Sequence, residues 1–248
     1  MAYKLEKISE IEFTEIERIP TGFLDLDLAY GKSIGFDEEG EVIKMVGLPR
    51  QMVSIWAGEP GVGKSRICMN IGLNICDYGM RTLYIINEDT AENLRRWAPS
   101  EINRDDFYIA SDCNDIEEQR ELIMDLSPDL VVIDSLNMVA NIRSPDDIKN
   151  AMTIWKDATQ ATQSHLILIA HMNKKGEIKG STDIPHLADI TCLLTKLDPP
   201  KNYLMMKDKG FFVLSVNKNR YGAGGSRVCF QHTEERVVFA ASDLVGKE

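Results

Sequence analysis

The sequence predicts an α/β fold in which helices cover both faces of a mostly parallel β-sheet. Near-continuous apolar runs rich in β-branched residues are typical of strands that are buried on both faces. Helical patterns alternate with these runs, as in βαβ units, and this alternation predicts a three-layer domain. The predicted strands are Met52–Ala57, Thr82–Ile86, Leu130–Ile133, Leu166–Ala170, Ile190–Leu194 and Phe211–Val216.

Helices are predicted over Lys64–Tyr78, Ile116–Leu126 and Asp146–Ser164, each between two of the strands. Near the carboxyl end, Thr233–Phe239 is expected to close a terminal hairpin. The segment Gly31–Gly47 holds several glycines and acidic residues with few strand signals. We therefore expect a surface insertion there.

Length and composition indicate one full-sized soluble domain. The chain has 248 residues, of which 44% are hydrophobic, and this excludes an intrinsically disordered chain. No apolar run approaches the roughly 18 residues of a membrane span, and the amino terminus lacks the apolar stretch of a signal peptide. Five cysteines without a CxxC pair argue against a zinc ribbon or a disulfide framework. We expect a cytoplasmic protein with no membrane partner.

Charge is distributed unevenly along the chain. The formal net charge of −11 argues against a general nucleic-acid coat protein. Residues 171–220 reverse the balance, with nine basic and five acidic side chains. An acidic protein with one basic stretch can still bind DNA locally, although a solvated surface has the same pattern.

A phosphate-binding loop is predicted between the first strand and the first helix. Residues 58–65 read GEPGVGKS and fit the Walker A pattern GxxxxGK(S/T). The glycines let backbone N–H groups surround phosphate oxygens, and the helix N-terminus favours negative charge. Lys64 can reach the β- and γ-phosphates of ATP, and Ser65 can bind Mg²⁺. The residues expected to contact the nucleotide are Gly58, Glu59, Pro60, Gly61, Val62, Gly63, Lys64, Ser65 and Arg66.

Asp134 follows the apolar run Leu130–Ile133 and gives a Walker B pattern. The buried strand brings its carboxylate to the carboxyl edge of the sheet, where it can help to hold Mg²⁺. Many strands end in Asp, so the pattern is weak by itself. It becomes strong because a Walker A motif lies about 70 residues earlier.

ATP hydrolysis also needs a group that orients or deprotonates the attacking water. Glu88 and Asp89 follow the strand Thr82–Ile86, which we expect beside the phosphate-loop strand. Glu88 is the candidate general base, and Asp89 is either its rival or a helix N-cap. His171 ends another strand at the same edge, where it either senses the γ-phosphate or has a structural role.

Several further segments carry a family resemblance. Residues 5–22 hold LEKISEI followed by RIPTG, and residues 130–135 read LVVIDS. Residues 170–180 read AHMNKKGEIKG, and residues 218–222 read KNRYG. Together with Walker A and the acidic pair, these segments resemble the RecA superfamily, in particular the bacterial RadA/Sms DNA-repair ATPases with their patterns GHVTKEGxIAGP and KNRFG.

This resemblance implies a RecA-like core that assembles into a homo-oligomeric, hexameric ring with ATP bound between protomers. Within one protomer the implied site is Lys64, Ser65, Glu88 and Asp134. Lys218 and Arg220 would reach the ATP of the neighbouring protomer and stabilise transition-state charge, as an arginine finger does. Their Lys-x-Arg spacing on a strand places both cations on one face.

The resemblance further implies DNA-stimulated movement along single-stranded DNA and contacts with other recombination or replication proteins. Two loops, residues 173–185 and 136–146, would face the DNA. Their basic residues are Lys174, Lys175, Lys179 and Arg143. Lysine contacts to phosphates give an affinity that depends on salt and not on sequence. The implied cellular role is the processing of recombination intermediates, including branch migration.

Residues 1–17 are interpreted as a linker or oligomerisation segment and residues 18–248 as the ATPase core. The apolar pattern in the first segment can pack on a neighbouring protomer, so a filament stays open beside a ring. Two other functions also stay open. One is a replicative-type hexameric helicase core, and the other is a KaiC-like regulatory ATPase or protein-assembly switch that binds no DNA.

Some features depart from the family. The sequence has no CxxC pair for the family's amino-terminal zinc finger, and it stops soon after the core, where family members carry a Lon-protease-like domain. The loading and partner binding that those domains supply are therefore in doubt here. Tyr221 stands where the signature has Phe, and Gly31–Gly47 and Asp198–Gly210 resemble additions.

Overall fold

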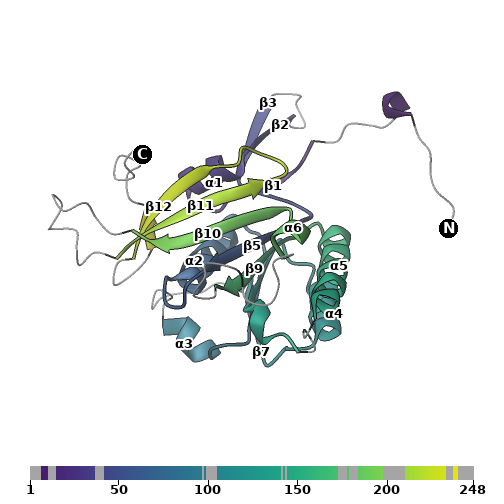
Figure 1. Ribbon diagram of the computed structural model, residues 1–248. Coiled ribbons are helices and arrows are strands. Elements are labelled where there is room, and N and C mark those ends of the chain that lie inside the picture. Colours follow the sequence, from purple (N-terminus) through teal and green to yellow (C-terminus); the bar gives the residue numbers. More distant parts are fainter. Residues whose placement is uncertain are drawn as a thin grey trace.

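A computed structural model describes residues 7–10, 15–36, 42–96, 98, 105–140, 142, 144–172, 178, 184–197, 210–232 and 237–239. These residues form a three-layer α/β domain around one large sheet (Figure 1). The predicted fold class, a RecA-like P-loop core with a mostly parallel sheet, is confirmed. Among the described residues, no helix has the length and apolarity needed to cross a membrane.

The central sheet has nine strands in the order β13-β12-β11-β10-β5-β9-β8-β6-β7. The six strands from β10 to β7 run parallel, whereas β11, β12 and β13 are antiparallel to their neighbours. The strands are β5 Met52–Gly58, β6 Thr82–Ile86, β7 Phe107–Ser111, β8 Leu130–Asp134, β9 His165–His171, β10 Ile190–Lys196, β11 Phe211–Asn219, β12 Ser226–His232 and β13 Val237–Phe239.

All six predicted strands are present, most of them with extended ends. Two others, β7 and β12, were not predicted from the sequence. β7 lies at the edge of the sheet with Tyr108 and Ile109 exposed, so it lacks the apolar run of a buried strand. The expectation that β6 lies beside β5 is wrong, because β9 and β8 lie between them.

Helices pack on both faces of the sheet. The helices are α1 Leu24–Tyr30, α2 Lys64–Asp77, α3 Ala91–Arg96, α4 Ile116–Leu126, α5 Pro145–Thr162 and α6 Ile184–Leu187, with 3₁₀ turns η1 Ile8–Glu10 and η2 Leu136–Met138. Residues of α1 and α2 share one buried cluster with the sheet, and residues of α4 and α5 share another on the opposite face (Figure 1). Along β5, Trp56 packs in the first cluster and Ile55 in the second, as the alternation of a strand requires.

Local sequence explains where the long helices begin. α5 begins at Pro145, one residue before the predicted start, because Ser144 and Asp147 form a capping box. Asp147 Oδ2 accepts from the Ser144 backbone N–H at 2.8 Å, and Ser144 Oγ accepts from the Asp147 N–H at 3.2 Å. Asp115 caps α4 in a similar way by accepting from the N–H of Glu117 at 2.9 Å.

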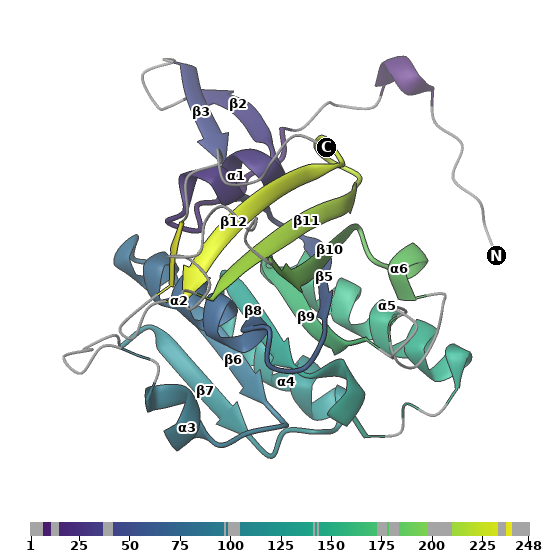
Figure 2. The same cartoon turned by 60° about the vertical axis from the view of Figure 1, so that its left-hand side comes forward.

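The segment Gly31–Gly47 contains a β-hairpin. Its strands, β2 Lys32–Phe36 and β3 Val42–Val46, pair antiparallel and project from the body above α1 (Figure 2). The projection agrees with an insertion, but the expectation of little strand structure is wrong. Near the carboxyl end, β13 pairs with β12, as a terminal hairpin over Thr233–Phe239 requires, while residues 233–236 lie outside the described part of the chain.

The amino-terminal region joins the body through a short strand pair. β1, Arg18–Ile19, pairs with β4, Leu48–Pro49, and begins directly after the predicted 1–17 segment. In that segment η1 lies away from the body in both ribbon views (Figures 1 and 2), and Ile8 is 85% exposed. The division of the chain at residue 17 stays a prediction.

Candidate active site

The phosphate loop connects the carboxyl end of β5 to the amino end of α2. Gly61 and Gly63 have φ angles of 79° and 86°, a region that strongly favours glycine. Gly63 is also the N-cap of α2, so the loop delivers the positive end of the helix dipole to its concave side. The loop therefore has the geometry that an anionic phosphate chain needs.

Lys64 is held against the loop. Its Nζ donates to the carbonyl oxygens of Gly58 and Glu59, both at 2.9 Å, and the residue is only 4% exposed. Burial lowers the pKa of the ammonium group, while the charges of Asp134 and Glu88 oppose this shift. A cation that is shielded from water attracts phosphate oxygens more strongly than one in bulk solvent.

Asp134 lies at the end of β8, at the same edge of the sheet. Its Oδ2 accepts a hydrogen bond from the Tyr84 hydroxyl at 2.8 Å, and the residue is 4% exposed. Burial raises the pKa of the carboxyl group, and hydrogen bonds from Ser65 and Tyr84 oppose the shift. The Ser65 hydroxyl beside the Asp134 carboxylate fits Mg²⁺, which usually binds one or two carboxylates together with phosphates and waters. Within the described ranges, no group of three or more His, Cys, Asp and Glu side chains forms a separate metal site.

Glu88 and His171 meet across the sheet from the ends of β6 and β9. The His171 Nε2 lies 2.8 Å from Glu88 Oε1 and 2.7 Å from Oε2. The His171 backbone N–H also donates to Asn137 Oδ1 at 3.0 Å. Glu88 is the more exposed partner, with 32% of its side chain accessible against 16% for His171. This pair presents a carboxylate to the pocket with a histidine that fixes its orientation.

Asp89 has a different environment. Its Oδ1 accepts from the Thr90 backbone N–H at 2.8 Å and from Asn93 Nδ2 at 2.6 Å, at the start of α3. Asp89 also borders a smaller pocket beside Ser65 and Asp134. The N-cap role considered for Asp89 belongs instead to Thr90, whose Oγ1 accepts from the Asn93 backbone N–H at 3.2 Å. The contacts of Asp89 with Thr90 and Asn93 still favour Glu88 as the water-facing carboxylate.

One cavity of about 430 Å³ unites these groups, within the size range of ligand pockets. Its lining is Pro60, Gly61, Gly63, Lys64, Ser65, Arg66, Glu88, Asp134, Ile169, His171 and His232. Five predicted site residues from four separate parts of the chain are thus brought together: Lys64, Ser65, Glu88, Asp134 and His171. His232 was not identified from the sequence, because the strand that carries it was not predicted.

Lys218 and Arg220 lie close together but far from this cavity, and Arg220 follows the end of β11 at Asn219, so the two cations do not share a strand. Lys218 Nζ donates to three carbonyl oxygens, those of Pro185 (3.1 Å), His186 (3.2 Å) and Ala188 (2.6 Å). Burial lowers the pKa of Lys218, and the neighbouring Arg220 charge lowers it further. The Arg220 Nη1 donates to Asp189 Oδ1 at 3.3 Å.

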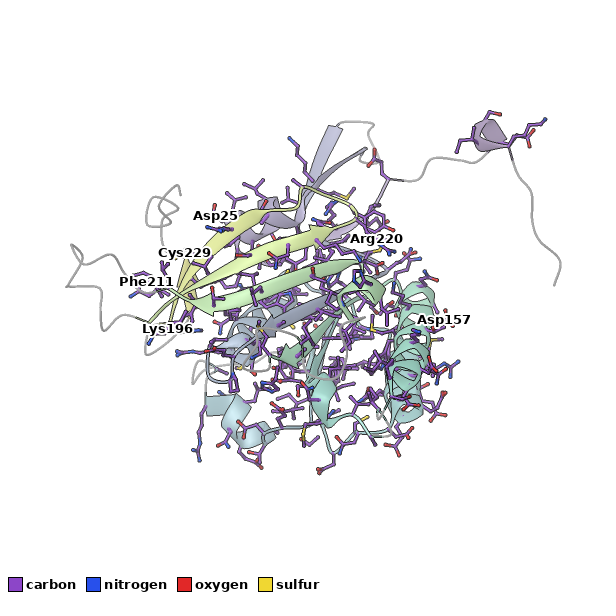
Figure 3. All side chains as sticks on the ribbon, viewed as in Figure 1. Asp25, Asp157, Lys196, Phe211, Arg220 and Cys229 are labelled. Carbon is purple, nitrogen blue, oxygen red and sulfur yellow. The ribbon has the colours of Figure 1, made fainter. Side chains whose placement is uncertain are left out.

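The contacts of Asp189 show that both cations lie where the parallel strands begin, at the end of the sheet opposite the phosphate loop. Asp189 Oδ2 accepts from the backbone N–H of Val53, near the beginning of β5, whereas the phosphate loop follows Gly58. Five residues of strand separate these positions by about 17 Å. Figure 3 shows Arg220 at one end of the β10–β11 pair and Lys196 and Phe211 at the other, the end near the loop.

Comparison with known proteins decides the family. The sequence profile of the AAA domain family matches residues 38–177, more than half of the chain. The chain belongs to this family of P-loop ATPases. Its predicted relation to RadA within the RecA superfamily is also confirmed, because curated proteins with that name match most of the chain.

Three of these relatives show the extent of the similarity. "DNA repair protein RadA" of Mycolicibacterium smegmatis is 26% identical over 236 residues, covering 90% of this chain and 45% of the relative. Its namesake in Haemophilus influenzae is 24% identical over 239 residues, covering 94% and 47%. The Chlamydia muridarum protein is 27% identical over 177 residues, covering 68% and 37%. The chain thus spans less than half the length of these relatives.

The DNA-facing residues predicted for this P-loop ATPase lie outside the described part of the chain. They are Lys174, Lys175, Lys179 and Arg143. The structure does describe residues that flank the loop 173–185. Met172 and Ile178 form an isolated antiparallel bridge, and α6 begins at Ile184, within the last two residues of the predicted DNA loop.

Proposed function

We propose that the protein is a DNA-dependent ATPase that hydrolyses ATP at a site shared by two protomers and moves on single-stranded DNA in recombination, repair or replication. One observation carries the proposal. Lys64, Glu88 and Asp134 surround a single cavity, whereas Arg220 lies about 17 Å away at the other edge of the sheet. The relatives named for DNA repair support the choice of DNA as the effector.

Each residue of the cavity has a distinct proposed role. Lys64 binds the β- and γ-phosphates, and Ser65 with Asp134 would hold Mg²⁺, which neutralises charge on the phosphates. Glu88 orients and deprotonates the attacking water. His171 holds the Glu88 carboxylate in place and, being next to it, responds to the presence of the γ-phosphate. The loop residues 58–63 and Arg66 complete the nucleotide contacts.

Lys218 and Arg220 are proposed to act on the ATP of a neighbouring protomer. Neither side chain can span about 17 Å to the loop of its own chain. A head-to-tail arrangement of protomers brings one edge of the sheet against the opposite edge of the next copy, and it produces rings or filaments. Arginine fingers supplied in this way commonly raise the rate by about 10³- to 10⁵-fold.

The contacts of Lys218 also suggest how DNA stimulates hydrolysis. Lys218 holds the carboxyl end of α6, and α6 begins within the last two residues of the predicted DNA loop. A displacement of that loop on DNA would therefore move α6 and with it Lys218 and Arg220. We propose that DNA binding sets the position of these two cations against the neighbouring ATP.

Lys174, Lys175, Lys179 and Arg143 are proposed to contact DNA phosphates. Repetition of these loops around an oligomer concentrates positive charge despite the acidic total. Residues 1–17 are proposed to hold neighbouring protomers together, in keeping with the large exposure of Ile8. Other recombination or replication proteins are proposed as further partners.

The test is ATP turnover measured against protein concentration, with and without single-stranded DNA, for the wild type, Lys218→Ala and Arg220→Ala. The expected result is a steep dependence on concentration, stimulation by DNA, and loss of turnover in both variants. A matched control is Lys149→Ala, because Lys149 lies on the exposed side of α5 and pairs only with Asp146 among the described residues.

A different outcome would redirect the assignment. ATP turnover that is unchanged by DNA and is retained in Lys218→Ala and Arg220→Ala contradicts the shared DNA-dependent site. That result favours the KaiC-like regulatory ATPase. Charge reversal at Lys174, Lys175 and Lys179 tests the DNA loop separately. It should reduce DNA stimulation and flatten the dependence of DNA affinity on salt concentration.

A further inference from the structure

His232 lies directly over the phosphate loop. The residue ends β12, and a Cβ atom added to Gly63 would collide with its imidazole ring. Behind the ring, Phe212 packs edge-on with 4.5 Å between ring centroids. The His232 backbone N–H also donates to the Gly210 carbonyl at 3.2 Å. The ring is therefore fixed between the end of the β11–β12 pair and the Walker A loop.

The ring nitrogens of His232 are buried and poorly satisfied. Neither Nδ1 nor Nε2 makes a hydrogen bond of normal geometry among the described residues, although the Val62 backbone interacts with the ring and opposes the fall in its pKa. Burial lowers the pKa of His232 to about 4, with the charge of Arg66 acting in the same direction. At neutral pH the ring is uncharged and offers one N–H donor and one acceptor. Buried polar atoms without partners are destabilising, so a ligand that supplies the partner gains affinity.

The sheet order shows which end of the nucleotide His232 approaches. Glu88, Asp134 and His171 come from β6, β8 and β9, which lie on one side of β5. His232 comes from β12, on the other side of β5. Lys64 and the groups around Glu88 mark the end of the cavity suited to the γ-phosphate. An extended nucleotide in this cavity therefore points its nucleoside toward His232.

We infer that His232 is a nucleotide-recognition residue that hydrogen-bonds the nucleoside part of ATP, its ribose or base. This inference deepens the proposed function and rests on it for the identity of the nucleotide. The residue has no part in the chemical step, because it lies on the opposite side of β5 from Glu88 and His171. Its contribution is affinity and selection for a nucleoside over a bare phosphate chain.

The experiment compares the binding of ADP and of inorganic tripolyphosphate by calorimetry to the wild type, His232→Phe and His232→Gln. Phe keeps a flat ring over Gly63 but removes both nitrogens, and Gln keeps a donor and an acceptor. His232→Phe is expected to weaken ADP binding by about 5- to 10-fold, the effect of one hydrogen bond. Tripolyphosphate affinity should stay within twofold, and His232→Gln should regain part of the lost ADP affinity.

Two results would overturn the inference. One is an unchanged ADP affinity in His232→Phe. The other is an equal loss of ADP and tripolyphosphate affinity, since the ring would then only shape the phosphate loop. Thermal unfolding of each variant controls for folding, and His232→Gln keeps the test valid if the Phe variant is unstable. The proposed motor function is contradicted by a different result: wild-type protein that binds ADP but whose ATP turnover is not stimulated by DNA.

Discussion

The Arg220 guanidinium donates a hydrogen bond to the Asp189 carboxylate, with 3.3 Å between Arg220 Nη1 and Asp189 Oδ1. Asp189 is only 5% exposed and is itself fixed by Lys156 Nζ at 3.1 Å and by the Val53 backbone N–H at 3.1 Å. Arg220 keeps half of its side chain exposed. A buried carboxylate at the amino end of β5 thus orients a cation that faces outward from the protomer.

Asp189→Asn is expected to loosen Arg220 and to lower DNA-stimulated kcat by about tenfold, because the ion pair becomes a weaker hydrogen bond from the guanidinium to a neutral amide. Nucleotide affinity should change by less than twofold, since Asp189 lies at the far edge of the sheet from the phosphate loop. Steady-state turnover and ADP titration check both values. Asp157→Asn, an exposed carboxylate on α5 (Figure 3), is the matched control. A loss of ADP affinity equal to the loss in kcat would contradict the positioning role.

Lys64→Ala is expected to reduce ATP hydrolysis by at least about 10²-fold, because it removes the buried ammonium that faces the phosphates. The measurement is phosphate release at saturating ATP. Lys149→Ala, which removes an exposed ammonium from α5, should retain wild-type turnover. Residual hydrolysis in Lys64→Ala above a tenth of the wild-type rate contradicts the role given to this side chain.

Glu88→Gln and Asp89→Asn distinguish the two adjacent acids. Glu88→Gln should lower hydrolysis by about 10²- to 10⁴-fold while ADP still binds, because the base is lost and the loop is intact. Asp89→Asn should lower it by less than tenfold, since Asp89 bonds to Thr90 and Asn93 at the start of α3. Single-turnover hydrolysis measures both, and the reverse order of effects would make Asp89 the base.

Acid should destabilise the fold through His165. The residue is fully buried, its Nε2 lies 2.8 Å from Ser54 Oγ and its Nδ1 lies 2.7 Å from the Pro49 carbonyl. Burial lowers its pKa from 6.5 to about 4, so the unfolded chain binds the proton better. The stabilisation that neutral His165 provides is therefore fully present above about pH 6.5 and is lost as the pH falls toward 4. His232, with its pKa also near 4, acts in the same direction.

Urea unfolding of the wild type and His165→Gln at pH 7 and pH 5 measures this effect. His165 is expected to contribute about 2 kcal/mol to the loss of wild-type stability between these pH values. His165→Gln cannot take up the proton, so its stability should fall by about 2 kcal/mol less over the same interval. An equal pH dependence in both proteins would contradict the buried neutral state of His165.

The fold was largely predictable because its signals are local. Runs such as Leu130–Ile133 are buried on both faces, and that burial leaves a continuous apolar pattern in the sequence. β7 escaped prediction because its exposed edge position removes the pattern. The hairpin of β2 and β3 escaped because glycines and acidic residues obscure its strands.

The candidate site was predictable only in part. Walker A is contiguous, and acids at strand ends mark the carboxyl edge of a parallel sheet whatever the order of the strands. For this reason Glu88 reaches His171 although β6 does not neighbour β5, contrary to expectation. His232 meets Gly63 only through tertiary packing of a strand far along the chain, and no local pattern encodes that contact.

The shared site is tested most directly by mixing Lys64→Ala with Arg220→Ala protein, each inactive alone. In a mixed oligomer, an Arg220→Ala protomer supplies an intact phosphate loop and its Lys64→Ala neighbour supplies an intact arginine. Random equimolar mixing pairs the two in this order at about a quarter of head-to-tail interfaces. The account predicts that DNA-stimulated turnover recovers to about a quarter of the wild-type value. Turnover no higher than that of the two separate variants would contradict it and place every catalytic group within one protomer.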